Sequence, residues 1–504
     1  MRGRNGRRVR HLLPTRLRRH WRLVTLACAA VLVLTVAVGE FRVRPYVSSR
    51  LVSQETVTQN IEGEGDLFDG GEHRVELTFN EDEYAEALRV FREEGEKEYI
   101  QADIVIDGTT VQDVGLRLKG NSTLMSLRSS GDSSGVGPGG EGPGGMGPGG
   151  TTLSEEEPEN LPWLISFDEF QTGRAYQGHT EIALRPGTST SATALNEALA
   201  LSLTAADGQT TQDHTFTSVS VNGGDAVPRL LLESPDEPWA AELGEGVLYK
   251  ARAGGSFDYL GDDPTAYEDA FRQVNDDGGH DLTPVTALLR FVAEADDEEF
   301  AARLPEYLDV DSFARYLATQ SLLANNDAMD GPGNNYYLWY DTEEERFTVL
   351  SWDLNLSFGG LGGGFGAGPG GAAGDEETFP EDGQVPGGGQ LPGGMEPPGG
   401  GQGTGGGLGG SGALKERFLA DDEFTARYEA AYAELYQELI ADGTAQEILD
   451  SVVAQAERAG DEGAAEAGEQ LAEQLAAVAE TPAAESTLRP GGAGREATDG
   501  TATG

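Results

Sequence analysis

Alternating hydrophobic and polar residues predict β-strands in the first half of the chain. The alternation is clear in 74–79, 99–107 and 111–119, and Gly108-Thr109-Thr110 would form the turn between the last two. Shorter runs with the same pattern predict further strands and hairpins. They are 163–167, 179–184, 215–221, 229–232 and 247–250.

Apolar residues at helical spacing predict helices between and after these strands. Asn80 caps a helix that runs to about Glu94, and leucines recur every four residues in 191–205. Later helices are capped by Thr283, with Pro284 at the first helical position, by Asp311, and by Asp421 or Asp422, and an Ala/Glu-rich helical stretch ends near Glu480. Strands followed by a larger helical part indicate an α+β fold.

The stretch 325–360 concentrates the candidate chemistry. Its pattern predicts a loop, a strand (336–340), an acidic turn and a second strand (347–352). The hairpin carries Asp330 on the loop before it and Asp353 at its far end. The two carboxylates would therefore converge.

This layout suits phosphoryl transfer, in which a protein mainly positions groups and neutralises charge. Asp330 would accept the proton of an attacking hydroxyl, and Asn335 and Asp353 would bind Mg²⁺ through oxygen atoms. Asp-x4-Asn followed by a hairpin and another Asp is also the order found in protein kinases. The spacing alone fits equally well with an acidic turn on a surface hairpin.

Several ordered motifs resemble the spore coat protein H (CotH) kinase family, which are atypical protein kinases. The similarity covers roughly residues 75–480, and its motifs are VGLRLKGNST (114–123), ISFDEF (165–170), LLLESPDE (230–237), GVLYKA (246–251), NNYYLWY (334–340) and WDLN (352–355) followed by Phe-Gly. The resemblance implies a two-lobed, protein-kinase-like α+β domain that uses ATP and Mg²⁺. It also implies that Asp330 is the catalytic-loop Asp, Asn335 the catalytic-loop Asn and Asp353 the metal-binding Asp.

Other candidate residues follow from the kinase-like arrangement. Arg117, Lys119, Asn121, Glu233 and Lys250 are candidates for nucleotide binding, although Arg117 and Lys119 also fit the polar face of a half-buried strand, and Lys250 the solvent-facing end of one. Two positions depart from the family pattern. Asn355, a candidate metal ligand, stands where the family usually has a second Asp, and Ser166 stands near the place of an expected Lys.

The amino-terminal end predicts export. Residues 1–22 hold nine arginines and no acidic residue, and the uncharged run 23–39 follows. This pattern fits a membrane anchor with the main domain outside the cytoplasm, or a cleaved signal peptide and a secreted protein. The only cysteine, Cys28, lies in this run, so the exported part would have no disulfides.

The charge balance excludes one class of partner. The formal net charge is −51, so the residues after the arginine-rich end carry −60, and such a surface would not bind nucleic acid through its phosphates. It suits a solvated protein outside the cell or one that attracts cations and basic partners, and a general acidic bias would explain it equally well.

We therefore expect a basic arm (1–22), an anchor or signal (23–39), a stalk or early edge strand (40–72), a kinase-like domain (73–480) and a tail (481–504). Gly-rich inserts at 129–151 and 359–412 would interrupt the domain. The expected activity is phosphorylation of Ser or Thr in an envelope or coat-type protein. The alternatives are a binding or adhesion protein that keeps the fold without catalysis, and a structural protein whose carboxylates hold Ca²⁺.

Overall fold

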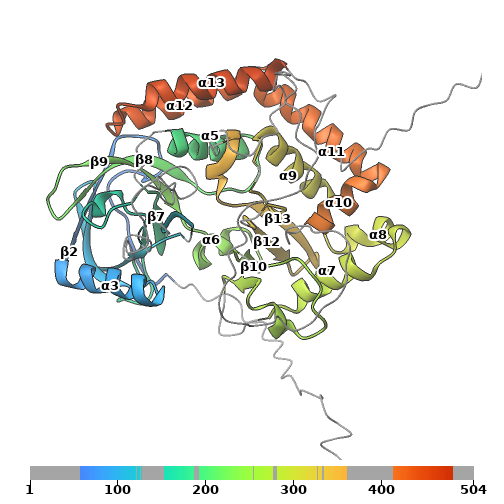
Figure 1. Cartoon of the computed structure of the whole chain (residues 1–504), viewed down its shortest axis with the longest axis horizontal. Coiled ribbons are helices and arrows are strands. Elements are labelled where there is room, and N and C mark those ends of the chain that lie inside the picture. The colour runs from blue at the N-terminus through green and yellow to red at the C-terminus, as the bar shows by residue number, and fades with distance from the viewer. Residues whose placement is uncertain are drawn as a thin grey trace, which may run out of the picture. The chain divides into compact units, whose positions relative to one another are not determined.

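Most of the described strands lie in the first half of the chain and most of the described helices in the second half, as Figure 1 shows. The computed structural model describes residues 57–120, 122–124, 127, 153–186, 192–253, 255–275, 281–325, 327–331, 334–359 and 412–480. The predicted α+β class is confirmed. The predicted basic arm, anchor, terminal tail and nearly all of both Gly-rich inserts lie outside the described residues.

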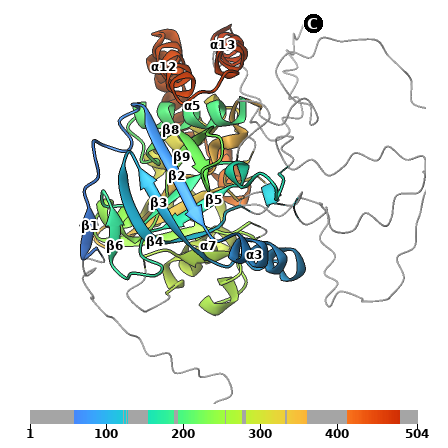
Figure 2. The same ribbon diagram turned by 90° about the vertical axis from the view of Figure 1, so that its left-hand side faces the viewer.

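Seven strands close into a barrel in which every neighbouring pair is antiparallel except β2 and β8, which close it in parallel (Figure 2). Inward-facing side chains of alternating positions build its core, as in β2, where Val75, Leu77 and Phe79 are buried. In order around the barrel the strands are β2 (His73–Phe79), β3 (Ile100–Ile106), β4 (Thr109–Leu118), β5 (Trp163–Ser166), β7 (Glu181–Leu184), β9 (Val227–Glu233) and β8 (His214–Val221).

The predicted β3–β4 hairpin is confirmed, with a turn one residue earlier than expected. Asp107 and Gly108 have φ of 48° and 87°, and Thr109 and Thr110 already belong to β4. Two successive positive φ angles are what a tight hairpin turn between twisted strands requires, and Gly adopts them without steric cost.

The region predicted as a stalk or early edge strand contains β1 (Gln59–Ile61), which pairs in parallel with β6 (Arg174–Tyr176). Arg174 is buried, and its guanidinium donates hydrogen bonds of 2.7 Å to the carbonyls of Phe167, Gln112 and Asp113. This residue therefore ties β6 to the neighbouring barrel strands.

A second, antiparallel sheet has the strand order β11-β10-β12-β13. Its strands β12 and β13 are the hairpin predicted around the acidic turn, and Tyr336 lies opposite Ser351. The strands are β10 (Gly246–Ala251), β11 (Phe271–Gln273), β12 (Tyr336–Asp341) and β13 (Arg346–Ser351), and the 3₁₀ segment η6 (Leu354–Gly359) follows β13.

Helices pack around the barrel and this sheet. The helix α5 contacts η6, α12 and α13, and the last two pass over it in Figure 1. The helix α9 packs between β13 and α11. The helices are α3 (Glu81–Glu94), α5 (Ala192–Ala206), α6 (Glu237–Glu242), α7 (Thr283–Glu294), α8 (Asp297–Arg303), α9 (Val310–Leu322), α10 (Gly412–Ala420), α11 (Asp422–Leu435), α12 (Thr444–Arg458) and α13 (Ala464–Glu480), with a π-helical turn η7 (Tyr436–Ala441).

Two predicted helix caps are confirmed and two are wrong. Asn80 and Asp421 accept backbone N–H hydrogen bonds at the starts of α3 and α11, as predicted. Thr283 begins α7 but does not cap it, because Leu282 is the N-cap and no side chain caps this end.

The prediction that Asp311 caps α9 is wrong. Asp309 accepts the Ser312 N–H at 3.0 Å, and Asp311 lies in the first turn, where a negative charge is also favourable.

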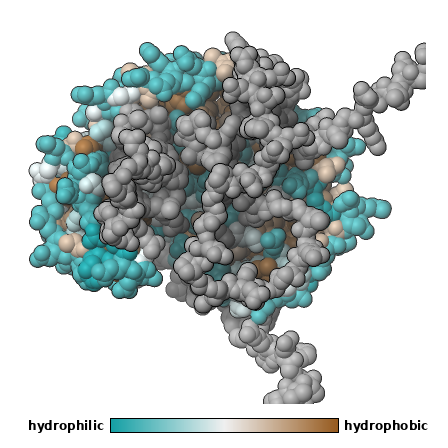
Figure 3. All heavy atoms as spheres, in the orientation of Figure 1, coloured by the Kyte–Doolittle hydropathy of each residue, from teal (hydrophilic) through white to brown (hydrophobic). Residues whose placement is uncertain are grey.

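On the face of the molecule that Figure 3 shows, the surface of the described residues is predominantly hydrophilic. Within the described residues, the exposed large hydrophobic side chains are Phe170 and Leu260. None of the helices in this part of the chain is both long and apolar enough to cross a membrane.

Candidate active site

Asp353 lies at the junction of β13 and η6 and forms an ion pair with Arg185. Its backbone has a φ of 55°, a conformation that is unfavourable for a residue with a side chain and that is often found at functional sites. The same Arg185 guanidinium binds the carboxylate of Glu197, with 2.6 Å between Nε and Oε2. One cation therefore joins the end of β7, helix α5 and the segment after β13.

The Arg185–Glu197 pair is buried at its acidic end, since the Glu197 side chain is only 2% exposed. Burial alone would lower the pKa of Arg185, but Asp353 and Glu197 together raise it above its usual value. Burial raises the pKa of the Glu197 carboxyl, and Arg185 opposes that rise. The guanidinium is thus a permanent charge beside Asp353.

Two lysines lie on the indole ring of Trp352, the residue before Asp353. The Nζ of Lys250 is 4.1 Å from the ring centroid, and that of Lys119 is 5.3 Å from it. Burial and the charge of Arg185 lower the pKa of Lys119 to about 8. Burial and the charge of Lys119 lower the pKa of Lys250 to about 7. Three basic side chains thus lie beside the Asp353 and Glu197 carboxylates, and an excess of positive groups suits the binding of a polyanion.

Arg117 lies close to this cluster but contacts a different ring. Leu116 and Leu118 are buried while Arg117 and Lys119 are half-buried, which confirms the predicted alternation along β4. The guanidinium of Arg117 lies 5.1 Å from the centroid of Tyr99. Its charge is one of those that lower the pKa of Lys119.

The predicted catalytic loop, between α9 and β12, carries two polar pairs. Asp330 Oδ2 is 2.5 Å from Nζ of Lys415, a residue of α10. The Asn335 amide donates to Asp327 Oδ2 at 2.8 Å. Asn335 is thus oriented by Asp327, a carboxylate to which the sequence interpretation gave no role.

The segment after Asp353 is fastened to both neighbouring helices. Asn196 of α5 donates to the Ser357 carbonyl at 3.1 Å, and the Phe358 N–H donates to the Leu323 carbonyl at 2.7 Å. Asn355, the candidate metal ligand, lies in the first turn of this segment, two residues from Asp353. These bonds fix the position of Asp353 relative to α5 and the end of α9.

Ser166, near the place of the family's expected lysine, does not contribute a charge. It is 2% exposed on β5, where its hydroxyl donates to Asp168 at 2.8 Å and accepts the Glu169 N–H at 3.1 Å. The charge in this region comes from Arg185, which lies at the end of the neighbouring strand β7 and pairs with Glu197 of α5.

The family comparison is consistent with this arrangement. The model of the family described as CotH kinase protein matches residues 145–472, which is more than half of the chain. The chain belongs to the CotH kinase family. The match includes Arg185, Glu197, Asp330 and Asp353. No curated protein matches this CotH-family chain.

One further candidate of this CotH-family chain lies elsewhere, and another is not among the described residues. Glu233 binds His179 Nδ1 at 3.1 Å and accepts the Asp213 N–H at 3.2 Å, so it belongs to a different polar cluster. Burial would lower the pKa of His179, but Glu233 raises it above the ordinary value. Asn121 lies outside the described residues.

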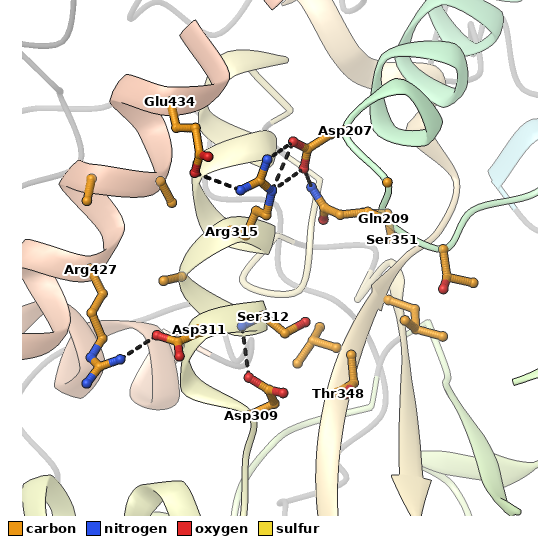
Figure 4. A pocket seen from close by; sticks show the side chains of 17 residues that line it. Asp207, Gln209, Asp309, Asp311, Ser312, Arg315, Thr348, Ser351, Arg427 and Glu434 are labelled. Atoms are coloured by element: carbon orange, nitrogen blue, oxygen red, sulfur yellow. Dashed lines mark hydrogen bonds and ion pairs between the residues drawn. The ribbon is translucent and has the colours of Figure 1, made fainter. Parts of the chain in front are cut away.

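A separate pocket of about 570 Å³ lies between α9, α11, β13 and the loop after α5 (Figure 4). Arg315 crosses it and binds Asp207 on one side, at 2.9 and 2.8 Å from Nε, and Glu434 on the other, at 2.9 Å. None of the predicted site residues lines this pocket.

The sequence interpretation missed Arg185, Glu197, Asp327 and Lys415. A weak signal existed for the first two, since a basic residue follows a predicted strand and an acidic one lies in the next predicted helix. Asp327 precedes Asn335 in the loop already singled out. Lys415 lies 85 residues beyond Asp330, so no local pattern indicates it.

Proposed function

We propose that this protein is an Mg²⁺- and ATP-dependent protein kinase that transfers the γ-phosphoryl group to a Ser or Thr of a protein. The observation that carries the proposal is the joint Asp353–Arg185–Glu197 ion pair with Lys119 and Lys250 beside it. Catalysis of phosphoryl transfer depends on placing positive charge around the phosphates, and this cluster supplies it.

The basic residues and Asp330 have different roles in the proposed reaction. Lys119, Lys250 and Arg185 bind and orient the phosphates of ATP. Asp330 accepts the proton of the Ser or Thr hydroxyl, whose oxygen forms the new bond to the γ-phosphorus. The bond between that phosphorus and the β,γ-bridging oxygen breaks, and ADP leaves with the electron pair.

The oxygen donors near Asp353 fit Mg²⁺. Arg185 contacts Oδ1 of Asp353, so Oδ2 together with the amide oxygens of Asn355 and Asn335 would hold the ion. Among the described residues no group of three or more His, Cys, Asp or Glu is placed to hold a metal. Magnesium bound with ATP usually takes one or two carboxylates plus phosphate oxygens, and it neutralises the charge of the phosphates. One carboxylate and two amide oxygens from the protein are therefore enough. A Ca²⁺ site would need more oxygen ligands.

A two-lobed arrangement is part of this proposal. The barrel with α5 would be the lobe that binds phosphates, since it carries Lys119, Arg185 and Glu197. The second sheet and the later helices would be the other lobe, since they carry Asp330 and Asp353. The nucleotide would then bind where β4, β7 and η6 approach one another.

We further propose that the domain acts outside the cytoplasm on an envelope or coat-type protein, either anchored by residues 23–39 or secreted. The basic and apolar amino-terminal pattern supports export. The large negative charge supports a protein partner over a nucleic acid.

The competing function is binding or adhesion without catalysis. Asn355 favours it, because an amide is a weaker ligand than the carboxylate usual in the family.

Thermal unfolding of the full chain with Mg²⁺ alone and with Mg²⁺ plus ATP separates these functions. ATP at about 100 times its dissociation constant adds roughly 2.7 kcal/mol, which raises the melting temperature by at least a degree or two. We expect this shift in the wild type and not in Asp353→Ala, together with loss of Mg²⁺-dependent phosphate labelling in the variant.

Labelling that survives in Asp353→Ala would contradict the kinase assignment. Absence of any shift at millimolar ATP would make the binding protein the better description, and a shift with Ca²⁺ alone would favour the structural-metal alternative.

A further inference from the structure

The ion pair between Lys415 and Asp330 joins two segments that are 85 residues apart in the chain. The Lys415 side chain is 16% exposed and that of Asp330 is 31% exposed, so the carboxylate side of the pair reaches solvent. Exposed pairs contribute little to stability because water and salt screen them. The position of this pair on the predicted catalytic loop suggests another purpose.

The helix that carries Lys415 is firmly packed. Leu414 and Phe418 of α10 are fully buried. The Phe418 ring meets Phe313 of α9 edge-on, with centroids 5.0 Å apart, and stacks on Phe424 of α11 at 4.8 Å. These contacts fix α10 against two other helices.

Arg417 fastens the same helix on another side. Its guanidinium donates to the Val292 carbonyl at 2.6 Å and to Asp297 at 3.0 Å, and it lies 4.2 Å from the centroid of Phe300. The Lys415 ammonium therefore starts from a backbone held to α7, α8, α9 and α11.

The Asp330 side is held by the same face of α9. Phe313 stacks on Tyr316 at 6.1 Å, and the Tyr316 hydroxyl accepts the N–H of Met329, the residue before Asp330, at 3.2 Å. Thus Phe313 contacts α10, while its neighbour Tyr316 holds the catalytic loop. Both members of the ion pair are positioned by one helix surface.

The choice of lysine at this position is informative. The chain has only four lysines among its 35 basic residues, at positions 97, 119, 250 and 415. Lys119 and Lys250 lie on Trp352, Lys415 binds Asp330, and Lys97 donates to the carbonyl of Gly120, next to Lys119. All four lysines therefore lie in or next to the candidate site, whereas the arginines occur throughout the chain.

Lysine and arginine differ in how they bind a carboxylate. An ammonium is a compact point charge, whereas a planar guanidinium tends to engage both oxygens. At position 415 the ammonium contacts Oδ2 of Asp330. Oδ1 then remains the oxygen to which a substrate hydroxyl is directed.

We propose that Lys415 is a positioning residue for the phosphoryl transfer proposed above, on which this inference rests. It turns the Asp330 carboxylate so that Oδ1 accepts the hydroxyl proton, and it adds positive charge beside the phosphoryl group in transit. This role requires lysine and not arginine at position 415, because a guanidinium would also occupy Oδ1, the proton-accepting oxygen of Asp330.

The test compares Lys415→Met and Lys415→Arg with the wild type of the full chain, using radiolabelled ATP and a mixture of Ser/Thr peptides. We expect both variants to lower kcat by roughly 10²-fold, with KM for ATP and the melting temperature nearly unchanged. Arg290→Met removes an exposed ion pair with Asp262, 3.2 Å long, and serves as the matched control with wild-type activity.

Each outcome is decisive. Wild-type activity in Lys415→Arg would mean that the pair only holds the structure, and it would overturn the inference while the kinase assignment stands. A rise in KM for ATP without a fall in kcat would also overturn it. Absence of transfer by the wild type would overturn both proposals. If Lys415→Met fails to fold, Lys415→Arg decides alone.

Discussion

The two acidic residues of the candidate site are supported in different ways. Asp353 shares its cation with a second carboxylate, Glu197, and has two further lysines nearby. Asp330 pairs with one lysine from a helix far along the chain. In the first region positive charge exceeds negative charge, which suits binding of a polyanion. In the second, each polar group has a specific partner, which suits orientation of a single carboxylate.

The comparison bears on the proposed binding of ATP by an acidic protein. With a formal charge of −51, the chain would repel a nucleotide at most of its surface. The cations beside Asp353 make a local exception, and burial together with mutual repulsion lowers the pKa of both lysines.

The largest expected difference between the two regions is in stability. Arg185→Met would leave the buried Glu197 carboxylate unpaired and destabilise the fold by about 3–5 kcal/mol, whereas loss of Lys415 would cost at most about 1 kcal/mol. Urea unfolding measures both. The double variant Arg185→Met/Glu197→Leu should recover most of the loss. If the loss of Arg185 and the loss of Lys415 lowered the free energy of unfolding equally, the two regions would not differ in this way.

The pH dependence should set the Asp353 region apart next. Lys250, with a pKa of about 7, and Lys119, with a pKa of about 8, lose their protons between pH 6 and 9, so ATP binding should weaken on the order of tenfold across that range. Calorimetric titration at four pH values measures this. Lys250→Arg, which stays charged, should reduce the dependence.

The stability of the nucleotide-free protein should change in the opposite direction. An unfolded lysine titrates near pH 10.4, so between about pH 7 and 10 the unfolded chain holds more protons on these residues than the folded one. The free energy of unfolding therefore rises with pH through this interval. If the free energy of unfolding fell with pH, or if the affinity for ATP did not change, the two lysines would be fully charged and their pKa values would not be lowered.

The smallest expected effect concerns the metal. Asn355→Asp adds a second carboxylate two residues from Asp353 and should raise the apparent Mg²⁺ affinity several-fold, since ligand charge strengthens binding of a hard cation. The Mg²⁺ concentration needed for the ATP-dependent melting shift measures it, with Asn355→Ala as control. If neither variant alters that concentration, Asn355 does not bind the metal.

Much of the fold followed from local rules. The alternation along β2 and β4, the caps at Asn80 and Asp421 and the hairpin around the acidic turn are properties of a few adjacent residues, so the sequence predicts them. The exception at the start of α9 is instructive. Both Asp309 and Asp311 are suitable caps, and the choice depends on the backbone before the helix, where Phe347 of β13 accepts the Asp309 N–H at 2.8 Å.

By itself, the sequence determined the α+β class, the candidate loop and hairpin, and the family, because strand alternation, helical spacing and ordered motifs are read from neighbouring residues. Only the tertiary structure decided which charges meet. Arg185 faces Asp353 across 168 residues, and Lys415 faces Asp330 across 85. Pairing at such separations depends on how the barrel closes and how α9 packs on α10. Charge alone does not identify the partner, because many other arginines in the chain carry the same charge.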